Sequence, residues 1–255
     1  MEPLIDYYAN NYNEDARHQD AFGKIQELRT RELIQRYLKP KMNILDVGGA
    51  TGVYSFFLAE RGHEVTLLDI VPEHIQAAQK ANATRKHPLK KLLVGDAVTF
   101  KSDESFDMII LHGPLYHIID RSVRIAVLAR MKTLLNPRGV LLGFGINRYA
   151  GYFYGIHTGK MLDKNYQQFV LDEMKTGIRT RSPGWYFHKP DELVEEFDEA
   201  GLNVQAIKSV ATQVWMLPEV DALLEDEQMT QELLQLAQAM EDETAIGQDL
   251  LCVGT

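Results

Sequence analysis

Cysteine is nearly absent from this chain, because only one of its 255 residues, Cys252, carries a thiol. A single thiol excludes an internal disulfide, and its apolar neighbours predict a buried, inert side chain. No group of Cys and His residues has the spacing of a zinc site, so we expect no bound metal.

Long apolar runs are missing as well. No run approaches the roughly 20 residues that span a bilayer. The first residues, Met1 to Asp6, lack the basic segment and apolar core of a signal peptide. We therefore expect a cytoplasmic protein that has no membrane partner.

Basic residues are missing from the last part of the chain. Residues 209–255 contain ten acidic residues and neither Lys nor Arg, whereas the preceding 208 residues carry 27 basic and 26 acidic side chains. A nearly neutral body offers no broad positive surface to nucleic acid, which makes RNA and DNA unlikely substrates. We expect the acidic stretch to form a solvated helical face.

Short apolar runs alternate with helical patterns along the chain. Strands are predicted at residues 42–47, 64–70, 91–94, 106–111, 140–146, 203–210 and 249–253. Helices are predicted within residues 1–40 and at 53–61, 72–83, 121–135 and 190–201, with a turn at 136–139. Strands that alternate with helices indicate parallel pairing, so the fold class is α/β, a Rossmann-like doubly wound sheet of seven mostly parallel strands.

One composite domain accounts for this pattern. We expect an N-terminal helical lid at 1–40, a cofactor-binding core at 41–147 and 190–255, and a substrate-cap insertion at 148–189. The insertion has no regular pattern but holds nine of the chain's 23 aromatic residues. These rings form either a dry wall over a ligand pocket or a hydrophobic core beneath a long loop.

Three acidic residues lie at the ends of three successive predicted strands, where Asp46 and Asp69 close the first two and Asp96 follows the third. Parallel strands end at one edge of a sheet, where ligands bind. A carboxylate after the second strand suits both hydroxyls of a ribose, and Asp96 suits an adenine amino group. The glycines of the turn from Gly48 to Gly52 permit close backbone approach to a ligand. A plain turn, a helix cap or an ion pair explains each feature singly, but their common register favours a nucleoside site.

These segments resemble the successive motifs of class I S-adenosylmethionine-dependent methyltransferases. The similar segments are Ile44-Leu-Asp-Val-Gly-Gly-Ala-Thr-Gly52, Val65-Thr-Leu-Leu-Asp69, Gly95-Asp-Ala97 and Phe106-Asp-Met-Ile-Ile-Leu111. The resemblance implies S-adenosylmethionine as cofactor and S-adenosylhomocysteine as product. It assigns cofactor binding to Asp46, Gly48, Gly49, Ala50, Gly52, Asp69, Ile70, Asp96, Ala97, Leu111 and His112, with Asp46 and the glycines at the methionine end.

Ala50 replaces the middle glycine of the family's turn, which we expect to be tolerated if this residue keeps a negative φ. The dinucleotide fingerprint G-x-G-x-x-G fails at Ala50 and at Val53. An acid at the first strand also suits a positively charged cofactor and would repel a pyrophosphate. We therefore favour S-adenosylmethionine over NAD.

The segment His112-Gly-Pro-Leu-Tyr-His117 resembles a signature of one bacterial subgroup of this family. His112 and His117 are candidate general bases, because His titrates near neutral pH. Tyr116 would orient the substrate or pack under the cofactor. A backbone contact for His112 and a packing role for His117 are the alternatives. His188 is a further candidate, for which a position in a surface loop is the alternative.

Several N-terminal residues are candidates for closing the site. Tyr7, Tyr8 and Tyr12 would belong to a segment that folds over the cofactor, and Arg17, Arg29 or Arg31 would meet its carboxylate.

The predicted function is methyl transfer from S-adenosylmethionine to an oxygen or nitrogen atom of an unidentified small molecule. A binding protein without turnover is one alternative, and a tRNA or protein methyltransferase is the other. The oligomeric state is left open.

Overall fold

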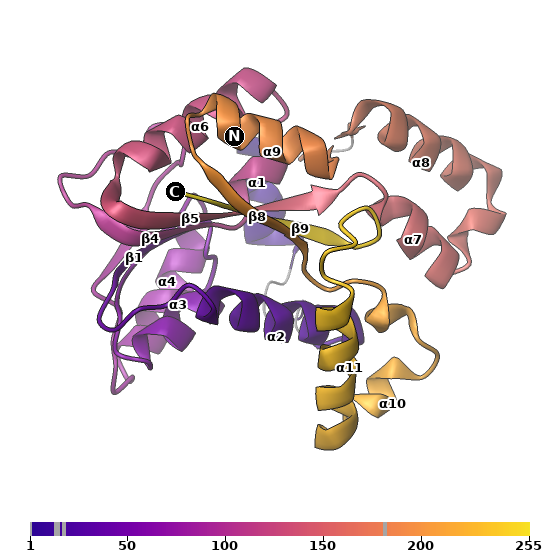
Figure 1. Cartoon of the computed structure of the whole chain (residues 1–255), viewed down its shortest axis with the longest axis horizontal. Coiled ribbons are helices and arrows are strands. Elements are labelled where there is room, and N and C mark those ends of the chain that lie inside the picture. Colours follow the sequence, from indigo (N-terminus) through magenta and orange to yellow (C-terminus); the bar gives the residue numbers. More distant parts are fainter. Residues whose placement is uncertain (1, 13–15, 17–18, 181–182) are drawn as a thin grey trace.

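A computed structural model describes residues 2–12, 16, 19–180 and 183–255. Nine strands form the central sheet of this described part (Figure 1). The strands are β1 (Asn43–Val47), β2 (Glu64–Asp69), β3 (Lys91–Val94), β4 (Phe106–Leu111), β5 (Leu135–Asn147), β6 (Ile178–Arg179), β7 (Trp185–His188), β8 (Val204–Ser209) and β9 (Asp249–Gly254). All seven predicted strands are present, and β6 and β7 are additional.

The sheet has the order β3-β2-β1-β4-β5, and these five strands are parallel. On the far side of β5, β9 pairs antiparallel with it, and β8 pairs antiparallel with β9. The short strand β7 joins only the end of β5, through Ile146 opposite Phe187 and Asn147 opposite His188. The predicted α/β class with a mostly parallel, doubly wound sheet is confirmed.

Helices cover both faces of the sheet. The helices on one face are α2 (Ala21–Gln35), α3 (Val53–Ala59) and α4 (Pro72–Asn82), and those on the other are α5 (Pro114–His117), α6 (Arg121–Thr133) and α9 (Pro190–Glu199). Figure 1 shows α2 and α3 below the sheet and α6 and α9 above it. Successive residues of a strand point to opposite faces. Ile44 therefore packs in one core and Leu45 in the other, and Cys252 is buried as predicted.

The remaining elements lie at the ends of the chain and in two insertions. They are α1 (Glu2–Asp6), the π-helical turn η1 (Tyr7–Asn11), α7 (Ala150–His157), η3 (Lys160–Leu162), α8 (Lys164–Thr176), η4 (Val214–Met216), α10 (Val220–Leu223) and α11 (Glu227–Ala239). Helices α7 and α8 occupy the segment for which the sequence predicts no regular structure. None of the helices in the described part of the chain has both the length and the apolar character needed to cross a membrane.

The predicted turn at residues 136–139 is wrong, because these residues belong to β5. The pairing of β4 with β5 shifts register between Phe106, opposite Leu135, and Met108, opposite Val140. The extra residues on β5 form a bulge, so Pro137 and Gly139 are accommodated inside a strand instead of ending it.

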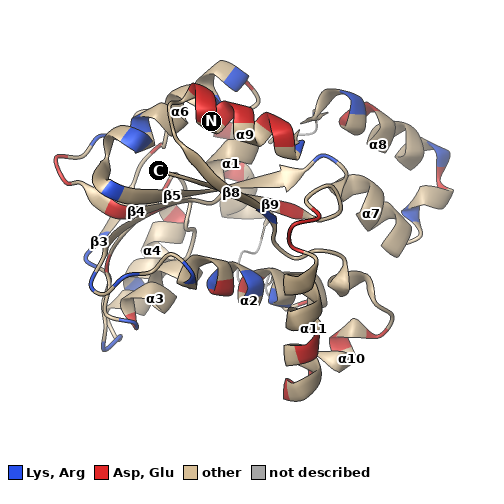
Figure 2. Ribbon diagram, viewed as in Figure 1, with Lys and Arg blue, Asp and Glu red and all other residues tan. Residues whose placement is uncertain are grey.

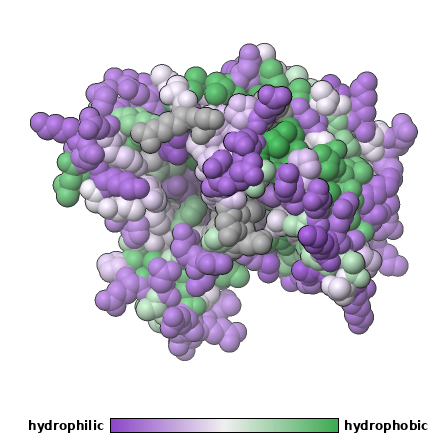
Figure 3. Space-filling model, turned by 180° about the vertical axis from the view of Figure 1, so that it is seen from behind, coloured by the Kyte–Doolittle hydropathy of each residue, from purple (hydrophilic) through white to green (hydrophobic). Residues whose placement is uncertain are grey.

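Charge is distributed unevenly over these layers. Figure 2 shows acidic and basic residues interspersed along α2 and α8, whereas α10 and α11 carry acidic residues without basic ones. From the opposite side, hydrophilic residues cover most of the visible face, with smaller apolar patches between them (Figure 3).

Candidate active site at the carboxyl edge of the sheet

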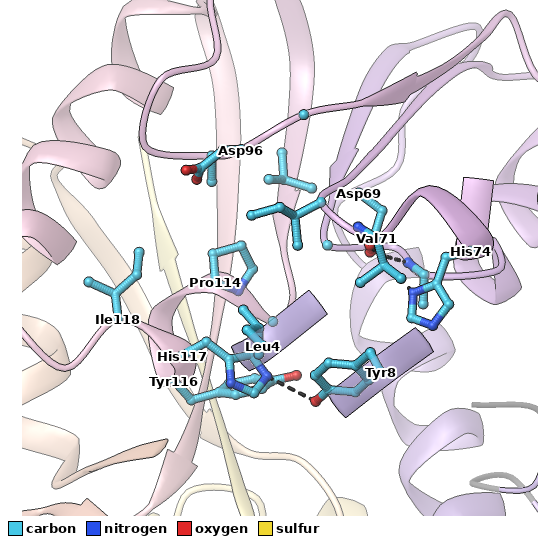
Figure 4. Close-up of a pocket in the computed structure, with 17 residues that line it drawn as sticks. Leu4, Tyr8, Asp69, Val71, His74, Asp96, Pro114, Tyr116, His117 and Ile118 are labelled. Atoms are coloured by element: carbon cyan, nitrogen blue, oxygen red, sulfur yellow. Dashed lines mark hydrogen bonds and ion pairs between the residues drawn. The ribbon is translucent and has the colours of Figure 1, made fainter. Parts of the chain in front are cut away.

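The turns that follow β1 to β4 line one pocket, which is partly open to solvent (Figure 4). Because these strands are parallel neighbours, their carboxyl ends lie side by side. The predicted residues that line the pocket are Gly48, Ala50, Asp69, Ile70, Asp96, Ala97, Tyr116 and His117. The residues Leu4, Tyr8, Val71, His74, Pro114 and Ile118 also line it. Apart from Tyr8, the sequence analysis did not single out any of the second group.

Asp69 connects two turns of this pocket. Its Oδ2 accepts a hydrogen bond from the Ala50 N–H at 2.9 Å, and its Oδ1 accepts one from the Val71 N–H at 2.8 Å. His74 Nδ1 lies 3.4 Å from Oδ1. Each carboxylate oxygen has a second lone pair, so Asp69 keeps acceptor capacity for a ligand hydroxyl.

The glycine turn after β1 has a conformation that its sequence only partly suits. Gly48 has φ 77°, and a Cβ there would lie 2.6 Å from the His112 carbonyl oxygen, so the position requires glycine. Ala50 has φ 49°, contrary to the negative φ on which its tolerance was predicted to depend. A non-glycine residue in this left-handed region costs about 1–2 kcal/mol. The hydrogen bond from Ala50 to Asp69 helps to hold this conformation.

Asp46 lies beneath the turn and does not line the pocket. It is fully buried, and its Oδ2 accepts a hydrogen bond from the Ser55 hydroxyl at 2.6 Å. Burial raises the Asp46 pKa to about 6, against the opposing effect of the Ser55 hydrogen bond. Gly49 packs against the same carboxylate, and neither Gly52 nor the buried Leu111 lines the pocket. The cofactor-binding roles of Asp46, Gly49, Gly52 and Leu111 therefore stay predictions.

The two candidate bases have different surroundings. The His112 ring is buried and stacks between Tyr54 and Phe144, with ring centroids 5.5 and 4.3 Å away, and it does not line the pocket. His117 lines the pocket, and its Nε2 lies 2.9 Å from the Tyr8 hydroxyl. Burial lowers the His117 pKa to about 4, and the Gly184 backbone and the Asp69 charge oppose that shift.

The charge of the pocket fits an adenosyl sulfonium. Two aspartates and no Lys or Arg are among the described residues that line it. Such a wall attracts a positively charged sulfonium and ammonium, whereas the phosphates of a dinucleotide would require positive groups. In the described part of the chain, no group of three or more His, Cys, Asp or Glu residues is arranged to hold a metal ion.

Comparison with known proteins supports the same conclusion. A family model described as a methyltransferase domain matches residues 44–139. Together with the acid-lined pocket and the sheet order, this match supports a class I S-adenosylmethionine-dependent methyltransferase. The predicted family and its cofactor are confirmed.

Similar curated proteins are methyltransferases or nodulation proteins. The chain is 32% identical over 111 residues to nodulation protein S of Rhizobium tropici, covering 44% of this chain and 45% of that protein. It is 27% identical over 167 residues to the tRNA 5-carboxymethoxyuridine methyltransferase of Escherichia coli K12, covering 64% and 60%. It is 30% identical over 170 residues to the ubiquinone biosynthesis O-methyltransferase of Pasteurella multocida, covering 63% and 65%. The matches thus span between about half and two thirds of these relatives.

Solved structures share the fold over nearly the whole chain. An S-adenosylmethionine-dependent methyltransferase from Methanosarcina mazei superposes with a TM-score of 0.60 at 18% identity, covering 87% of this chain and 95% of that one. The glycopeptide N-methyltransferase MtfA in complex with S-adenosylhomocysteine superposes with a TM-score of 0.57 at 15% identity, covering 98% and 96%.

Several predictions for the outer part of this methyltransferase are wrong. The Arg29 side chain is fully buried and forms an ion pair with Glu241, and Arg31 forms one with Glu27, so both guanidinium groups are engaged away from the pocket. Arg17 lies outside the described residues. His188 is not in an exposed loop, because it is fully buried 3.4 Å from a Glu196 oxygen. Burial lowers the His188 pKa.

The aromatic residues of the insertion do not line this pocket. Trp185 approaches its rim, with a ring centroid 5.9 Å from that of His117 and 5.7 Å from that of Tyr7. Of the N-terminal tyrosines, Tyr8 lines the pocket. The Tyr12 ring packs edge-on against the Tyr8 ring, with the two ring centroids 5.4 Å apart. The N-terminal segment and the insertion therefore meet at His117.

Proposed function

We propose that this protein transfers the methyl group of S-adenosylmethionine to an oxygen or nitrogen atom of a small-molecule acceptor. The observation that carries the proposal is that one pocket combines two features. Asp69 and Asp96 provide acceptors for a nucleoside on one side, and Tyr116 and His117 provide polar groups on the other. A methyl donor and its acceptor must meet in such a continuous space, because proximity supplies much of the rate.

Each wall has a distinct role in this proposal. Asp69 accepts hydrogen bonds from the ribose hydroxyls, and Asp96 accepts one from the adenine amino group while the Ala97 N–H donates one. The backbone at Gly48 and Ala50 lies along the methionine end. The bound sulfonium supplies an activated methyl group, so the protein has to orient the acceptor and exclude water. Residues 1–40 act as a lid, 41–147 and 190–255 as the core, and 148–189 as a substrate cap.

A tRNA substrate is the second candidate, because one of the similar proteins is a tRNA methyltransferase. The charge distribution argues against it. Figure 2 shows acidic and basic residues interspersed along α2 and α8, only acidic charged residues along α9, α10 and α11, and no cluster of basic residues in that view. Binding of tRNA through phosphates would show a steep salt dependence, so weak, salt-insensitive binding supports the small-molecule proposal.

Calorimetry with S-adenosylmethionine, S-adenosylhomocysteine and NAD tests the cofactor assignment. We expect both adenosyl ligands to bind and NAD not to bind. The variant Asp69→Asn should weaken S-adenosylhomocysteine about 100-fold, since hydrogen bonds to a charged group contribute about 1.5–3 kcal/mol. Asp103 is an exposed aspartate that does not line the pocket, so Asp103→Asn is the control and should leave the affinity unchanged.

Turnover is tested separately. The protein is incubated with S-adenosylmethionine and a metabolite extract, and release of S-adenosylhomocysteine is followed by mass spectrometry. Release above the level of Asp69→Asn supports transfer. Tight cofactor binding without any release across broad extracts would instead favour a binding protein without turnover.

A further inference from the structure

The Tyr8 side chain reaches into the pocket and meets His117, which lies 109 residues away in the sequence. In Figure 4 the two side chains point toward each other, and their hydroxyl and Nε2 atoms are 2.9 Å apart. Tyr8 belongs to η1, whereas His117 ends α5 on the wall of the pocket. A phenol of the protein itself thus occupies the space beside the candidate base.

The Tyr8 hydroxyl and the His117 ring form a hydrogen bond whose direction depends on the tautomer of His117. Burial lowers the pKa of His117 to about 4, so the ring is neutral near pH 7. In the tautomer that has its proton on Nδ1, Nε2 carries the lone pair and the Tyr8 hydroxyl donates to it.

We propose that Tyr8 occupies the place of the acceptor, and that the acceptor is a phenol-like molecule whose hydroxyl donates to His117 Nε2. This inference rests on the proposed methyl transfer and specifies its substrate class. It names a hydroxyl on an aromatic ring as the methylated group, with Tyr8 as an internal mimic that the acceptor displaces.

The surroundings of the Tyr8 ring suit another aromatic ring. His74 and His117 contact it edge-on, with centroids 5.9 and 5.4 Å away, and both belong to helices that pack on the sheet. Edge-to-face packing of this kind stabilises an aromatic ring beyond its burial. These two contacts stay in place for an incoming phenol when Tyr8 leaves.

The segment that carries Tyr8 is suited to move. No residue of α1 or η1 is buried, so displacing them exposes little apolar core. A π-helical turn such as η1 is rare and is frequently found at functional sites. The ring contacts with His74 and His117 and the hydrogen bond to His117 that Tyr8 gives up on release are restored by a bound phenol.

The transfer step balances with His117 as the proton acceptor. A lone pair of the acceptor oxygen forms the new bond to the methyl carbon as the C–S bond breaks, and the electron pair of that bond remains on sulfur. The hydroxyl proton passes to His117 Nε2. The products are a methyl ether, a neutral thioether and an imidazolium ion that returns its proton to water.

The basicity of His117 favours oxygen over nitrogen. With a pKa of about 4, the ring is neutral at physiological pH and is too weak a base to deprotonate an alkylammonium ion of pKa about 10. A hydroxyl whose oxygen is acquiring a third bond is far more acidic and loses its proton to such a base readily. The titratable side chains that face the ring are Tyr8, Tyr116 and Asp69.

Tyr8→Ala opens the proposed subsite, and 4-methylphenol, the side chain of tyrosine, is the probe. Ligand-observed NMR titrations in the presence of S-adenosylhomocysteine compare this phenol with toluene, which lacks the hydroxyl. We expect Tyr8→Ala to prefer the phenol about tenfold, the effect of one hydrogen bond. The preference should be constant from pH 6 to 8 and should vanish in Tyr8→Ala/His117→Leu.

Two matched controls keep the result specific. Tyr12→Ala removes a ring of the same size from the same N-terminal segment but opens no space beside His117, so it should bind both probes as weakly as the wild type. Tyr8→Phe keeps the ring in place and should do the same. With S-adenosylmethionine, Tyr8→Ala should convert 4-methylphenol to 4-methylanisole with an equal amount of S-adenosylhomocysteine, and should leave 4-methylbenzylamine, an alkylammonium ion at neutral pH, unmethylated.

Equal binding of phenol and toluene by Tyr8→Ala would overturn the inference, as would preferential methylation of the benzylamine. Either result leaves the proposed function intact if S-adenosylhomocysteine still binds. Loss of that binding in the wild type would instead refute the proposed function. A folded Tyr8→Ala, verified by its thermal unfolding, is expected because Tyr8 supports no buried core.

Discussion

The two sides of the carboxyl edge are built in different ways. On the nucleoside side, the contacts join segments that are close in sequence, such as the hydrogen bond between Ala50 and Asp69, 19 residues apart. On the acceptor side, they join distant segments. The Tyr8–His117 contact spans 109 residues, and the hydrogen bond from Arg124 to Glu196 spans 72. The nucleoside side can therefore be recognised from local sequence motifs, whereas the acceptor side forms only when the chain has folded.

Buried ion pairs hold the second side together. Arg124 and Glu196 are both fully buried, and the Arg124 Nη2 lies 2.6 Å from Glu196 Oε1. Arg124 also donates to the carbonyl oxygens of Ile118 and Ile119, next to the pocket wall, and its guanidinium lies 3.7 Å from the centre of the Tyr186 ring. One side chain thus links α6, α9, β7 and the loop after α5.

The largest effect is expected where this link is broken. Arg124→Met should lower the free energy of unfolding by about 3–5 kcal/mol, because it leaves Glu196 buried without its guanidinium partner. Urea denaturation measures the loss. Arg121 lies on the same helix but is exposed and paired with Glu199, so Arg121→Met should cost at most about 1 kcal/mol. Equal losses in the two variants would contradict the special role of the buried pair.

An effect of intermediate size is expected from Glu241. Burial alone would raise its pKa, but hydrogen bonds from Arg36 and Arg29 outweigh burial and lower the pKa from 4.5 to about 2. A pKa lowered in the folded state stabilises the protein above the unfolded value, and this stability is lost as the pH falls toward the folded value.

Denaturation of the wild type and Glu241→Gln at two pH values tests this linkage. The stability gap between the two proteins should narrow by about 2 kcal/mol between pH 7 and pH 3. The control is Asp242→Asn, a change at an exposed neighbour. The stability gap between this variant and the wild type should change by less than about 0.5 kcal/mol between pH 7 and pH 3. A gap that does not depend on pH would show that the paired carboxylate does not couple α2 to the acidic end of the chain.

The smallest effect is expected on the nucleoside side. Ala50→Gly should raise the free energy of unfolding by about 1 kcal/mol, since glycine adopts φ 49° without a Cβ clash. Ala77 lies in the exposed part of α4, and Ala77→Gly should lower the stability by about 1 kcal/mol. Destabilisation by Ala50→Gly would mean that the methyl group makes contacts worth more than the backbone strain.

Most of the sheet could be predicted because each strand carries its own signal. The exceptions have packing reasons. Helix α7 was missed because residues 148–189 show no regular apolar pattern, and two glycines, Gly151 and Gly155, lie within the helix. A Cβ at Gly151 would lie 2.4 Å from Glu173 Oε1, and one at Gly155 would lie 2.4 Å from Tyr166 Cε1, both on α8. Glycine is there to let two helices approach, a condition that sequence periodicity does not reveal.

The acidic end of the chain shows the same limit. Its composition predicted a solvated face, and most of its acids are exposed, but Glu241 and Asp249 are buried. Gln26 and Arg29 on α2 and Arg36 at the C-cap of α2 form hydrogen bonds with them, and Lys208 forms a further ion pair with Glu241. The local absence of Lys and Arg gave no sign that Arg29 and Arg36 would come from more than 200 positions away.

The sequence by itself determined the α/β alternation, the three acids in register and the family, because these depend on the order of residues within each strand and turn. Only the tertiary structure decided which of the two candidate histidines lines the pocket, which backbone φ angle Ala50 adopts and which tyrosine faces His117. These properties arise from contacts between segments that are remote in the chain, and such contacts are set by the packing of the whole sheet and its two helical layers.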